Sequence, residues 1–183
     1  MIRLLDFLAA FFGLILLSPF ILIISAILFA EHRKPFFIQK RVGKDQKLFT
    51  LIKFRSMSPK AANLPTHEIS VDLITKTGKF IRATKLDELP QLWNVLKGEM
   101  SLVGPRPCLP TQEELISERA SRGVFSLRPG ITGPAQVQNI DMSTPKKLAI
   151  EDSKMVENLK VTDYFKYVLM TVTGSGQGDK VRN

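Results

Sequence analysis

The sequence predicts a mostly helical α+β protein, with a membrane-inserted segment at residues 1–34 and a small domain at residues 35–183 that contains a β-hairpin. Three observations predict this class. An uncharged apolar run lies near the N-terminus, two short strand-like stretches flank a loop with glycine and aspartate, and much of the remaining chain has the apolar spacing of helices. A length of 183 residues suits one domain with one appended segment.

The apolar run extends from Phe7 to Ala30 and contains 24 residues without a charge. About 20 such residues suffice to cross a hydrocarbon core of about 30 Å. A signal peptide fits less well, because no small-x-small cleavage site precedes Glu31. A buried helix of a soluble protein would be unusually long and apolar on every side. The run therefore predicts insertion into a membrane.

A Ser18-Pro19 step interrupts the middle of this run. Proline removes a backbone hydrogen bond and clashes with the preceding turn, so a kinked helix that spans the bilayer is one outcome. The other is a re-entrant hairpin of two short arms, with Arg3 and the Arg33-Lys34 pair on the same face of the membrane. Basic residues at both ends favour the hairpin, and either arrangement predicts that the domain rich in lysine and arginine is cytoplasmic.

Strand and loop signals follow the apolar run. Residues 36–39 and 48–54 predict a β-hairpin with Gly43 and Asp45 in its loop. Proline and glycine content predicts further loops, the second of them extended and rigid, at 58–68, 101–110 and 127–136.

Helical spacing and start or stop signals predict the remaining elements. A loose helix is expected over 70–82, interrupted near Gly78, and a second begins after Asp87 and ends at Gly98. Further helices are expected at 111–122 and at 145–159, the latter opened by a proline at its first position. The apolar stripe of a last helix favours burial in the core over membrane contact, and consists of Tyr164, Phe165, Val168, Leu169 and Val172.

The formal charge of +9 and a pI near 9.8 predict an anionic partner: nucleic acid, a membrane surface or phosphorylated substrates. Nucleic acid is disfavoured, because the basic loops contain few aromatic residues and a membrane segment is present. A single cysteine, Cys108, excludes an internal disulfide. The two histidines, His32 and His67, lack the spacing of metal ligands, so a zinc site is not expected.

An acidic pair, Asp87-Glu88, stands directly before a Leu-Pro step and an apolar helix face. Capping explains such a pair on its own, because aspartate, glutamate and proline all favour the first turn of a helix. The surroundings favour chemistry instead. Cationic residues in proline- or glycine-flanked loops suit the recognition of phosphate, and they would keep the pair ionised as a nucleophile and a ligand for a divalent metal. These cations are Lys53, Arg55, Arg82, Arg106 and Arg128.

Three ordered blocks carry a resemblance to a known family: "KFRSM" (53–57), "KLDELPQLWNVLKGEMSLVGPRP" (85–107) and "RPGITGPAQV" (128–137). Together they resemble the bacterial sugar transferase family, the monotopic polyprenyl-phosphate phosphoglycosyl transferases. The similarity extends from the apolar segment to about Gly178 and is closest to the small members of the family.

The resemblance implies transfer of a sugar-1-phosphate from a UDP-sugar to a membrane polyprenyl (undecaprenyl) phosphate at the bacterial inner membrane, with release of UMP. It implies that Asp87 attacks phosphorus and forms a phosphoryl-aspartate, and that Glu88 helps to hold Mg²⁺. It also implies a re-entrant membrane helix broken at Ser18-Pro19. An anionic nucleophile that approaches a pyrophosphate needs positive charge already in position, which the five cations would supply. Arg106 and Arg128 are the strongest candidates, because neighbouring prolines limit their backbone freedom.

Two departures from the family pattern fall in one region. Pro134 stands where a larger apolar residue is usual, and "QNIDMSTP" (138–145) replaces a Gly-Arg step. Both departures fall in a region expected to lie near the donor sugar, so they bear on which sugar is used. An N-acetylated deoxyamino sugar is expected. A non-catalytic membrane-anchored module that binds anionic lipid headgroups through its basic loops is the alternative function.

Overall fold

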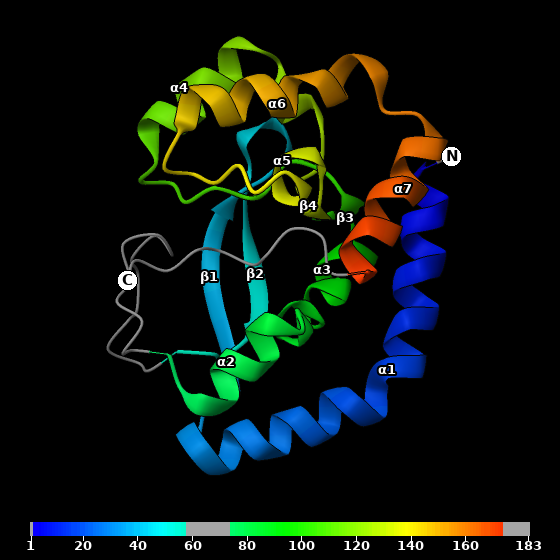
Figure 1. Ribbon diagram of the computed structural model, residues 1–183, viewed down its shortest axis with the longest axis vertical. Coiled ribbons are helices and arrows are strands. Elements are labelled where there is room, and N and C mark those ends of the chain that lie inside the picture. The colour runs from blue at the N-terminus through cyan, green and yellow to red at the C-terminus, as the bar shows by residue number, and fades with distance from the viewer. Residues whose placement is uncertain (1, 58–73, 174–183) are drawn as a thin grey trace.

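The computed structural model describes residues 2–57 and 74–173 (Figure 1). It is mostly helical with two small sheets, which confirms the predicted α+β class. The helices are α1 (Ile2–His32), α2 (Lys76–Ala83), α3 (Gln91–Lys97), α4 (Glu113–Ser121), α5 (Pro134–Val137), α6 (Pro145–Asn158) and α7 (Val161–Val172). The strands are β1 (Phe36–Val42), β2 (Leu48–Phe54), β3 (Ser101–Val103) and β4 (Gly130–Thr132), and the 3₁₀ turns are η1 (Lys44–Gln46), η5 (Leu86–Glu88) and η6 (Val124–Ser126).

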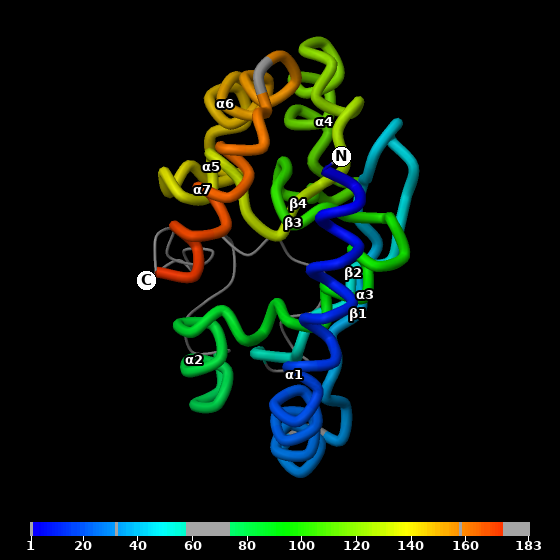
Figure 2. The backbone as a smooth tube through the Cα atoms, turned by 90° about the vertical axis from the view of Figure 1, so that its right-hand side faces the viewer, coloured from blue at the N-terminus to red at the C-terminus, as the bar shows by residue number. Residues whose placement is uncertain are grey.

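The apolar run forms one helix, α1, of 31 residues that contains Pro19. Figures 1 and 2 agree that α1 bends part-way, so that its first half runs along α3 and its second half runs across the end of the domain near α2. Proline at position 19 accounts for a bend, because it cannot donate the backbone bond of that turn. In place of the expected two short arms, the structure therefore has a single helix that bends. By length and composition α1 is able to cross a membrane.

Both halves of α1 pack against the domain with one side. Ala10, in the first half, is fully buried against Leu92 and Val95 of α3. In the second half, Leu28 is fully buried in a cluster that includes Phe54 of β2. The opposite side of α1 carries exposed apolar residues along its whole length: Leu4, Phe7, Leu8, Phe11, Phe12, Ile15, Leu16, Phe20, Leu22, Ile23, Ile27 and Phe29.

Polar contacts fix the start of α1, and sequence reasoning missed them. The buried Asp6 carboxylate accepts hydrogen bonds at one oxygen from Ser101 Oγ (2.9 Å), Leu102 N–H (2.9 Å) and Tyr164 O–H (2.8 Å). Arg3 donates to the carbonyls of Val95 (2.6 Å) and Leu96 (2.9 Å) at the end of α3. Burial and the Asp6 carboxylate raise the pKa of Tyr164, which therefore remains a donor. These contacts tie α1 to β3, α3 and α7.

The predicted hairpin is confirmed with a longer first strand. β1 and β2 pair antiparallel over seven residues each, from Phe36 opposite Phe54 to Val42 opposite Leu48. Lys40 and Arg41 belong to β1 rather than to the loop, because their pairing with Thr50 and Phe49 continues the ladder. The turn keeps Asp45 in a left-handed conformation, with φ at 53°.

The two loops expected at 101–110 and 127–136 are only partly loops. β3 and β4 form a parallel pair, with Ser101 opposite Gly130 and Val103 opposite Thr132. The backbones approach so closely that a Cβ at Gly130 would lie 2.0 Å from the Gly104 nitrogen. Residues 134–137 form the short helix α5. Pairing between such distant short segments leaves no local signal of alternating polarity, which is why the Pro and Gly content dominated the prediction.

The helix α2 differs from the prediction in one respect, and α3 ends as predicted. α2 is continuous through Gly78, where an added Cβ would lie 1.9 Å from the Ser56 carbonyl oxygen, so this glycine serves close packing rather than a break. α3 ends at Gly98 as expected, with φ at 87°. The loop predicted at 58–68 and residues 70–73 of the first predicted helix lie outside the described residues.

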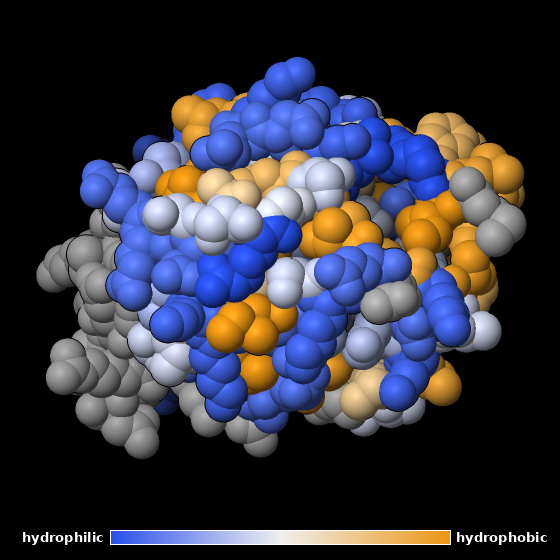
Figure 3. Space-filling view, turned by 90° about the horizontal axis from the view of Figure 1, so that it is seen from above, coloured by the Kyte–Doolittle hydropathy of each residue, from blue (hydrophilic) through white to orange (hydrophobic). Residues whose placement is uncertain are grey.

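The apolar stripe of α7 is not all core. Tyr164 is 2% exposed, whereas Leu169 is 64% exposed and Val172 is 79% exposed. The prediction of a buried stripe is therefore wrong for its outer residues, because α7 packs on β3 and β4 through one narrow side. Seen from above, the molecule is largely hydrophilic, and apolar residues gather at the edge where α1 and α7 lie in Figure 1 (Figure 3).

Candidate active site

The acidic pair lies on the turn η5, between α2 and α3, with Asp87 only 6% exposed. The preceding Lys85 has a left-handed backbone, with φ at 56°. Such a conformation is uncommon for a residue with a side chain and is often found at functional sites. Leu86 and Leu89, on either side of the pair, pack in the cluster that contains Ile24 and Leu28 of α1. The turn thus rests its apolar residues on the second half of the apolar helix.

Burial dominates the electrostatics of Asp87. It raises the pKa of this carboxyl from an ordinary value of 3.8 to about 6, with a smaller upward effect from Glu88. Lys53, Arg82 and Arg106 act in the opposite direction but do not cancel burial. The surrounding cations thus act in the expected direction, towards the ionised form, but burial outweighs them in setting this pKa. At pH 7 the carboxylate still predominates by roughly ten to one, and it is a stronger base than an exposed aspartate.

Cations from three elements surround the pair. Lys53 Nζ lies 2.9 Å from Glu88 Oε1, and Arg106 Nη1 lies 3.6 Å from the same oxygen. Arg82, in the last turn of α2, acts electrostatically on Asp87. The structure therefore brings together three of the five predicted cations, from β2, α2 and the loop after β3.

The other two predicted cations bind backbone carbonyls elsewhere. Arg55 donates through Nε to the carbonyl of Lys34 (3.0 Å) and through Nη2 to that of Phe36 (3.1 Å), at the junction of α1 and β1. Arg128 donates through Nε to the carbonyl of Gly98 (2.9 Å), at the end of α3. The structure does not bring these two guanidinium groups to the Asp87 pair. Proline beside an arginine restricts its backbone but does not say which way its side chain points.

A small polar cavity adjoins the pair. Its lining includes Lys53, Glu88 and Arg106, together with Arg41 of β1 and Gln91 of α3. Gln91 is 2% exposed, and its Nε2 has no hydrogen-bond partner. An unsatisfied buried donor costs about 1–3 kcal/mol, and the cavity is large enough only for a water-sized group, so a single oxygen atom that enters it would relieve this cost.

The pair also fits a divalent metal. Magnesium in phosphoryl-transfer sites is held by one or two carboxylates plus substrate phosphates, and Asp87 and Glu88 are two adjacent carboxylates. A cation beside Asp87 would also offset the burial that raises the pKa of this carboxyl. Within residues 2–57 and 74–173 there is no group of three acidic, histidine or cysteine side chains that would hold a metal without a substrate.

Sequence reasoning missed three residues of this site. Lys85 lies beside Glu88 and Arg106, and burial, followed by Arg106, lowers its pKa against the opposing effect of Glu88. Gln91 was visible one helical turn after Glu88 and would have been found by that spacing. Arg41 carried no local signal, because contacts between β1 and a loop 66 residues further along the chain place it here, among them its own hydrogen bond to the Pro107 carbonyl.

The arrangement suits chemistry on phosphate groups at a membrane surface. The turn η5 brings together two carboxylates, one of them buried and of raised basicity, and four cations: Lys53, Arg82, Lys85 and Arg106. This turn rests on an apolar helix that has an exposed side. Fold and site together define a membrane-associated protein with a carboxylate site for anionic ligands.

The chain belongs to the bacterial sugar transferase family. The model of that family matches residues 1–177. A Bacillus subtilis protein described as the uncharacterized sugar transferase EpsL is 40% identical over 174 residues, which cover 93% of this chain and 84% of the relative. The resemblance carried by the three sequence blocks is therefore confirmed.

Relatives with described activities are similar at comparable levels. The UDP-glucose:undecaprenyl-phosphate glucose-1-phosphate transferase of Klebsiella pneumoniae is 41% identical over 74% of this chain. The UDP-N-acetylgalactosamine-undecaprenyl-phosphate N-acetylgalactosaminephosphotransferase of Aeromonas hydrophila is 36% identical over 93% of it. The matched residues are 30% of the first relative and 43% of the second, so these are longer proteins of which this chain spans less than half.

Proposed function

We propose that this protein transfers a sugar-1-phosphate from a UDP-sugar to undecaprenyl phosphate and releases UMP. The burial of Asp87 beside Glu88, with Lys53, Arg82 and Arg106 close by, carries the proposal. Relatives named for this kind of transfer, with different sugars, support it. The sugar of this chain follows from neither observation, and an N-acetylated deoxyamino sugar stays a prediction.

Asp87 acts as the nucleophile in this proposal. Its carboxylate oxygen forms a bond to the sugar-linked phosphorus, the bond from that phosphorus to the bridging oxygen breaks, and UMP leaves with the electron pair. An oxygen of undecaprenyl phosphate then forms a bond to the same phosphorus and frees the carboxylate. Each step exchanges one oxygen for another at phosphorus, so a soluble donor and a lipid acceptor use one site in turn.

The cations supply the charge that this reaction needs. The attacking carboxylate and the pyrophosphate repel each other, so donors held in advance around the reacting phosphorus lower the barrier. Arg106 and Lys53 contact Glu88, and the proposal requires them to turn towards the phosphates of the donor. Gln91 Nε2 would then donate to a phosphoryl oxygen. Asp87 and Glu88 would hold Mg²⁺, which would supply positive charge against the charge that develops on the leaving group.

The attachment of α1 supports a re-entrant arrangement of this helix in the membrane. A helix that crosses a bilayer carries its ends to opposite faces of a hydrocarbon core of about 30 Å. Here Arg3 and Asp6 bind the domain at one end, and Arg55 binds residues 34 and 36 at the other. One body holds both ends, so α1 would dip into one leaflet with its exposed apolar side. We infer that the domain lies on the cytoplasmic face, as the basic flanks indicate.

The test is Mg²⁺-dependent release of UMP from UDP-sugars, with undecaprenyl phosphate as acceptor in detergent micelles. We expect turnover with at least one UDP-sugar, lost on addition of EDTA and in Asp87→Asn. A folded protein that binds anionic vesicles but releases no UMP from any UDP-sugar in a donor screen would favour the lipid-binding alternative.

A further inference from the structure

The loop that carries Arg106 is held by donors from several elements. Four successive carbonyl oxygens accept hydrogen bonds: Pro105 from Gly130 N–H (2.9 Å), Arg106 from Arg119 Nη1 (2.8 Å), Pro107 from Arg41 Nη1 (3.1 Å) and Cys108 from Val42 N–H (3.0 Å). These donors come from β4, α4 and β1. Pro105 and Pro107 have no N–H of their own, so the carbonyls are the polar handles by which the protein can orient this loop.

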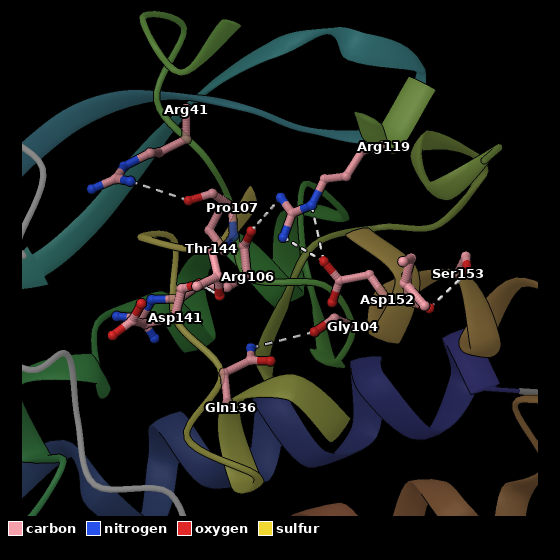
Figure 4. A network of polar contacts seen from close by, with 11 residues as sticks. Arg41, Gly104, Arg106, Pro107, Arg119, Gln136, Asp141, Thr144, Asp152 and Ser153 are labelled. Carbon is pink, nitrogen blue, oxygen red and sulfur yellow. Dashed lines mark hydrogen bonds and ion pairs between the residues drawn. The ribbon is translucent and has the colours of Figure 1, made fainter. Parts of the chain in front are cut away.

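Arg119 provides the most buried of these contacts. It is 2% exposed, and besides the Arg106 carbonyl it binds Asp152 Oδ2 through Nε (2.9 Å) and Nη2 (2.6 Å). Asp152, on α6, is fully buried. Figure 4 shows Arg119 between the Arg106 backbone and Asp152, with Arg41 reaching Pro107 from another direction. One planar guanidinium therefore joins α4, α6 and the loop after β3.

Burying a charge pair of this kind costs desolvation free energy, and a benefit that can offset this cost is a fixed conformation of its neighbours. Replacing such a pair by apolar residues is often neutral or stabilising, so the pair by itself is weak evidence of a role in stability. What Arg119 adds over an apolar residue is a fixed direction for the Arg106 carbonyl. That carbonyl is bound on the inner side of the loop, whereas the Arg106 side chain extends to Glu88.

We propose that Arg119, held by Asp152, is a positioning residue that orients the Arg106 loop so that the Arg106 guanidinium faces the Asp87–Glu88 pair. The inference rests on the proposed function for its effect on turnover, but the tether itself does not depend on it. Such positioning matters because a displacement of about 1 Å in a group that contacts the reacting phosphate can cost about 10²-fold in rate.

Arg119→Lys is the informative substitution. It keeps the positive charge opposite Asp152, but a single ammonium cannot reproduce the planar fork that reaches both Asp152 and the Arg106 carbonyl. We expect kcat to fall about tenfold or more while the KM for the UDP-sugar changes by less than about threefold. In an Arg106→Ala background the same substitution should cost less than about twofold, because the residue through which it acts is absent. Equal losses in both backgrounds would overturn the proposal.

A second measurement tests the tether, which is the contact of Arg119 with Asp152 and the Arg106 carbonyl, without measuring turnover. Cys108 is the chain's single cysteine, is fully buried and ends the same loop, and burial raises the pKa of its thiol. Its labelling by N-ethylmaleimide under native conditions therefore reports on loop opening. We expect Arg119→Lys to accelerate labelling. Leu28→Ala, in a different core cluster, is the matched control for a general loss of stability.

The outcomes separate the two proposals. Faster labelling of Cys108 in Arg119→Lys than in a Leu28→Ala protein of equal or lower Tm supports the tether, whatever the catalytic result. Labelling no faster than in that control overturns the tether. A wild-type protein without UMP release counts against the proposed function, and the labelling comparison then decides the tether alone.

Discussion

Among single residues, Asp87 is buried in a way that raises its basicity and lowers the stability of the fold when its carboxyl is ionised. Its carboxyl has a pKa of about 6 in the fold and an ordinary value of 3.8, so the folded state binds its proton more tightly. The contribution to stability is fully present below about pH 4 and is lost as the pH rises through 6. Near pH 7 the ionised side chain therefore lowers the free energy of unfolding.

Asp87→Asn should therefore abolish turnover and raise stability. Without metal at pH 7, the variant should be more stable than the wild type by about 2–3 kcal/mol, because the cost of burying the charge disappears. The measurement is thermal unfolding in EDTA at pH 4 and pH 7. The gain should shrink at pH 4, where wild-type Asp87 is protonated, and a gain that is equal at both values would contradict the assigned pKa.

Arg106 and Arg122 form a matched pair for the role of local charge. Arg106→Ala should lower kcat by about 10²–10³-fold, because it removes a donor near the reacting phosphorus. Arg122 lies away from the site, where it pairs with Glu118 on α4. Arg122→Ala therefore removes the same charge at a distance from the reacting phosphorus and should leave turnover near the wild-type rate. Steady-state UMP release measures both. Similar losses in the two variants would mean that net charge, rather than position, sets the rate.

The sequence allowed the acidic pair and three of the site's cations to be predicted, but not the electrostatic balance. Lys53, Asp87, Glu88 and Arg106 belong to short contiguous blocks of the sequence, and Arg82 stands three residues before the second block. The depth of Asp87 depends on which residues pack over η5, which spacing does not encode. Arg128 showed the same limit, since the direction of its side chain follows from a contact with Gly98 thirty residues away.

At the scale of elements, the start of α1 is fixed by Asp6. Asp6→Ala leaves Ser101, Leu102 and Tyr164 without their common acceptor, and we expect it to lower the free energy of unfolding by about 3–5 kcal/mol. Tyr164→Phe removes one of the three donors and should cost only about 1 kcal/mol. Chemical unfolding in micelles compares the two. Equal costs would show that the three bonds do not act through one carboxylate.

Asp6 illustrates what element-level prediction leaves out. The uncharged apolar run begins at Phe7, so the criterion that defines the run leaves out Asp6, the residue directly before it. A charged residue next to a membrane segment calls for a partner, and that general rule would have singled out Asp6. Its three partners lie about a hundred or more residues away, so their identity needed the structure. The same reason hid the β3–β4 pair, whose strands have three residues each.

In the molecule as a whole, both ends of α1 are expected to face the same side of the membrane. Single cysteines at Ile2, which packs against the domain rather than on the exposed apolar side, and at Lys34, in a Cys108→Ser background, should both react with a membrane-impermeant maleimide added to the cytoplasmic side of inverted vesicles. A cysteine at Phe20, which is 57% exposed on the apolar side, should react poorly from either side because it would lie in lipid. Labelling of the cysteines at positions 2 and 34 from opposite sides would show that α1 spans the bilayer.

The central claim is that Asp87 forms a covalent bond to phosphorus. The most direct measurement is intact-protein mass spectrometry after brief incubation with a UDP-sugar and Mg²⁺ without the lipid acceptor, followed by acid quenching and peptide mapping. We predict an added mass of one sugar-phosphate on the peptide that contains Asp87, lost on addition of undecaprenyl phosphate. An active wild-type protein with no adduct, or turnover retained in Asp87→Asn, would contradict the claim.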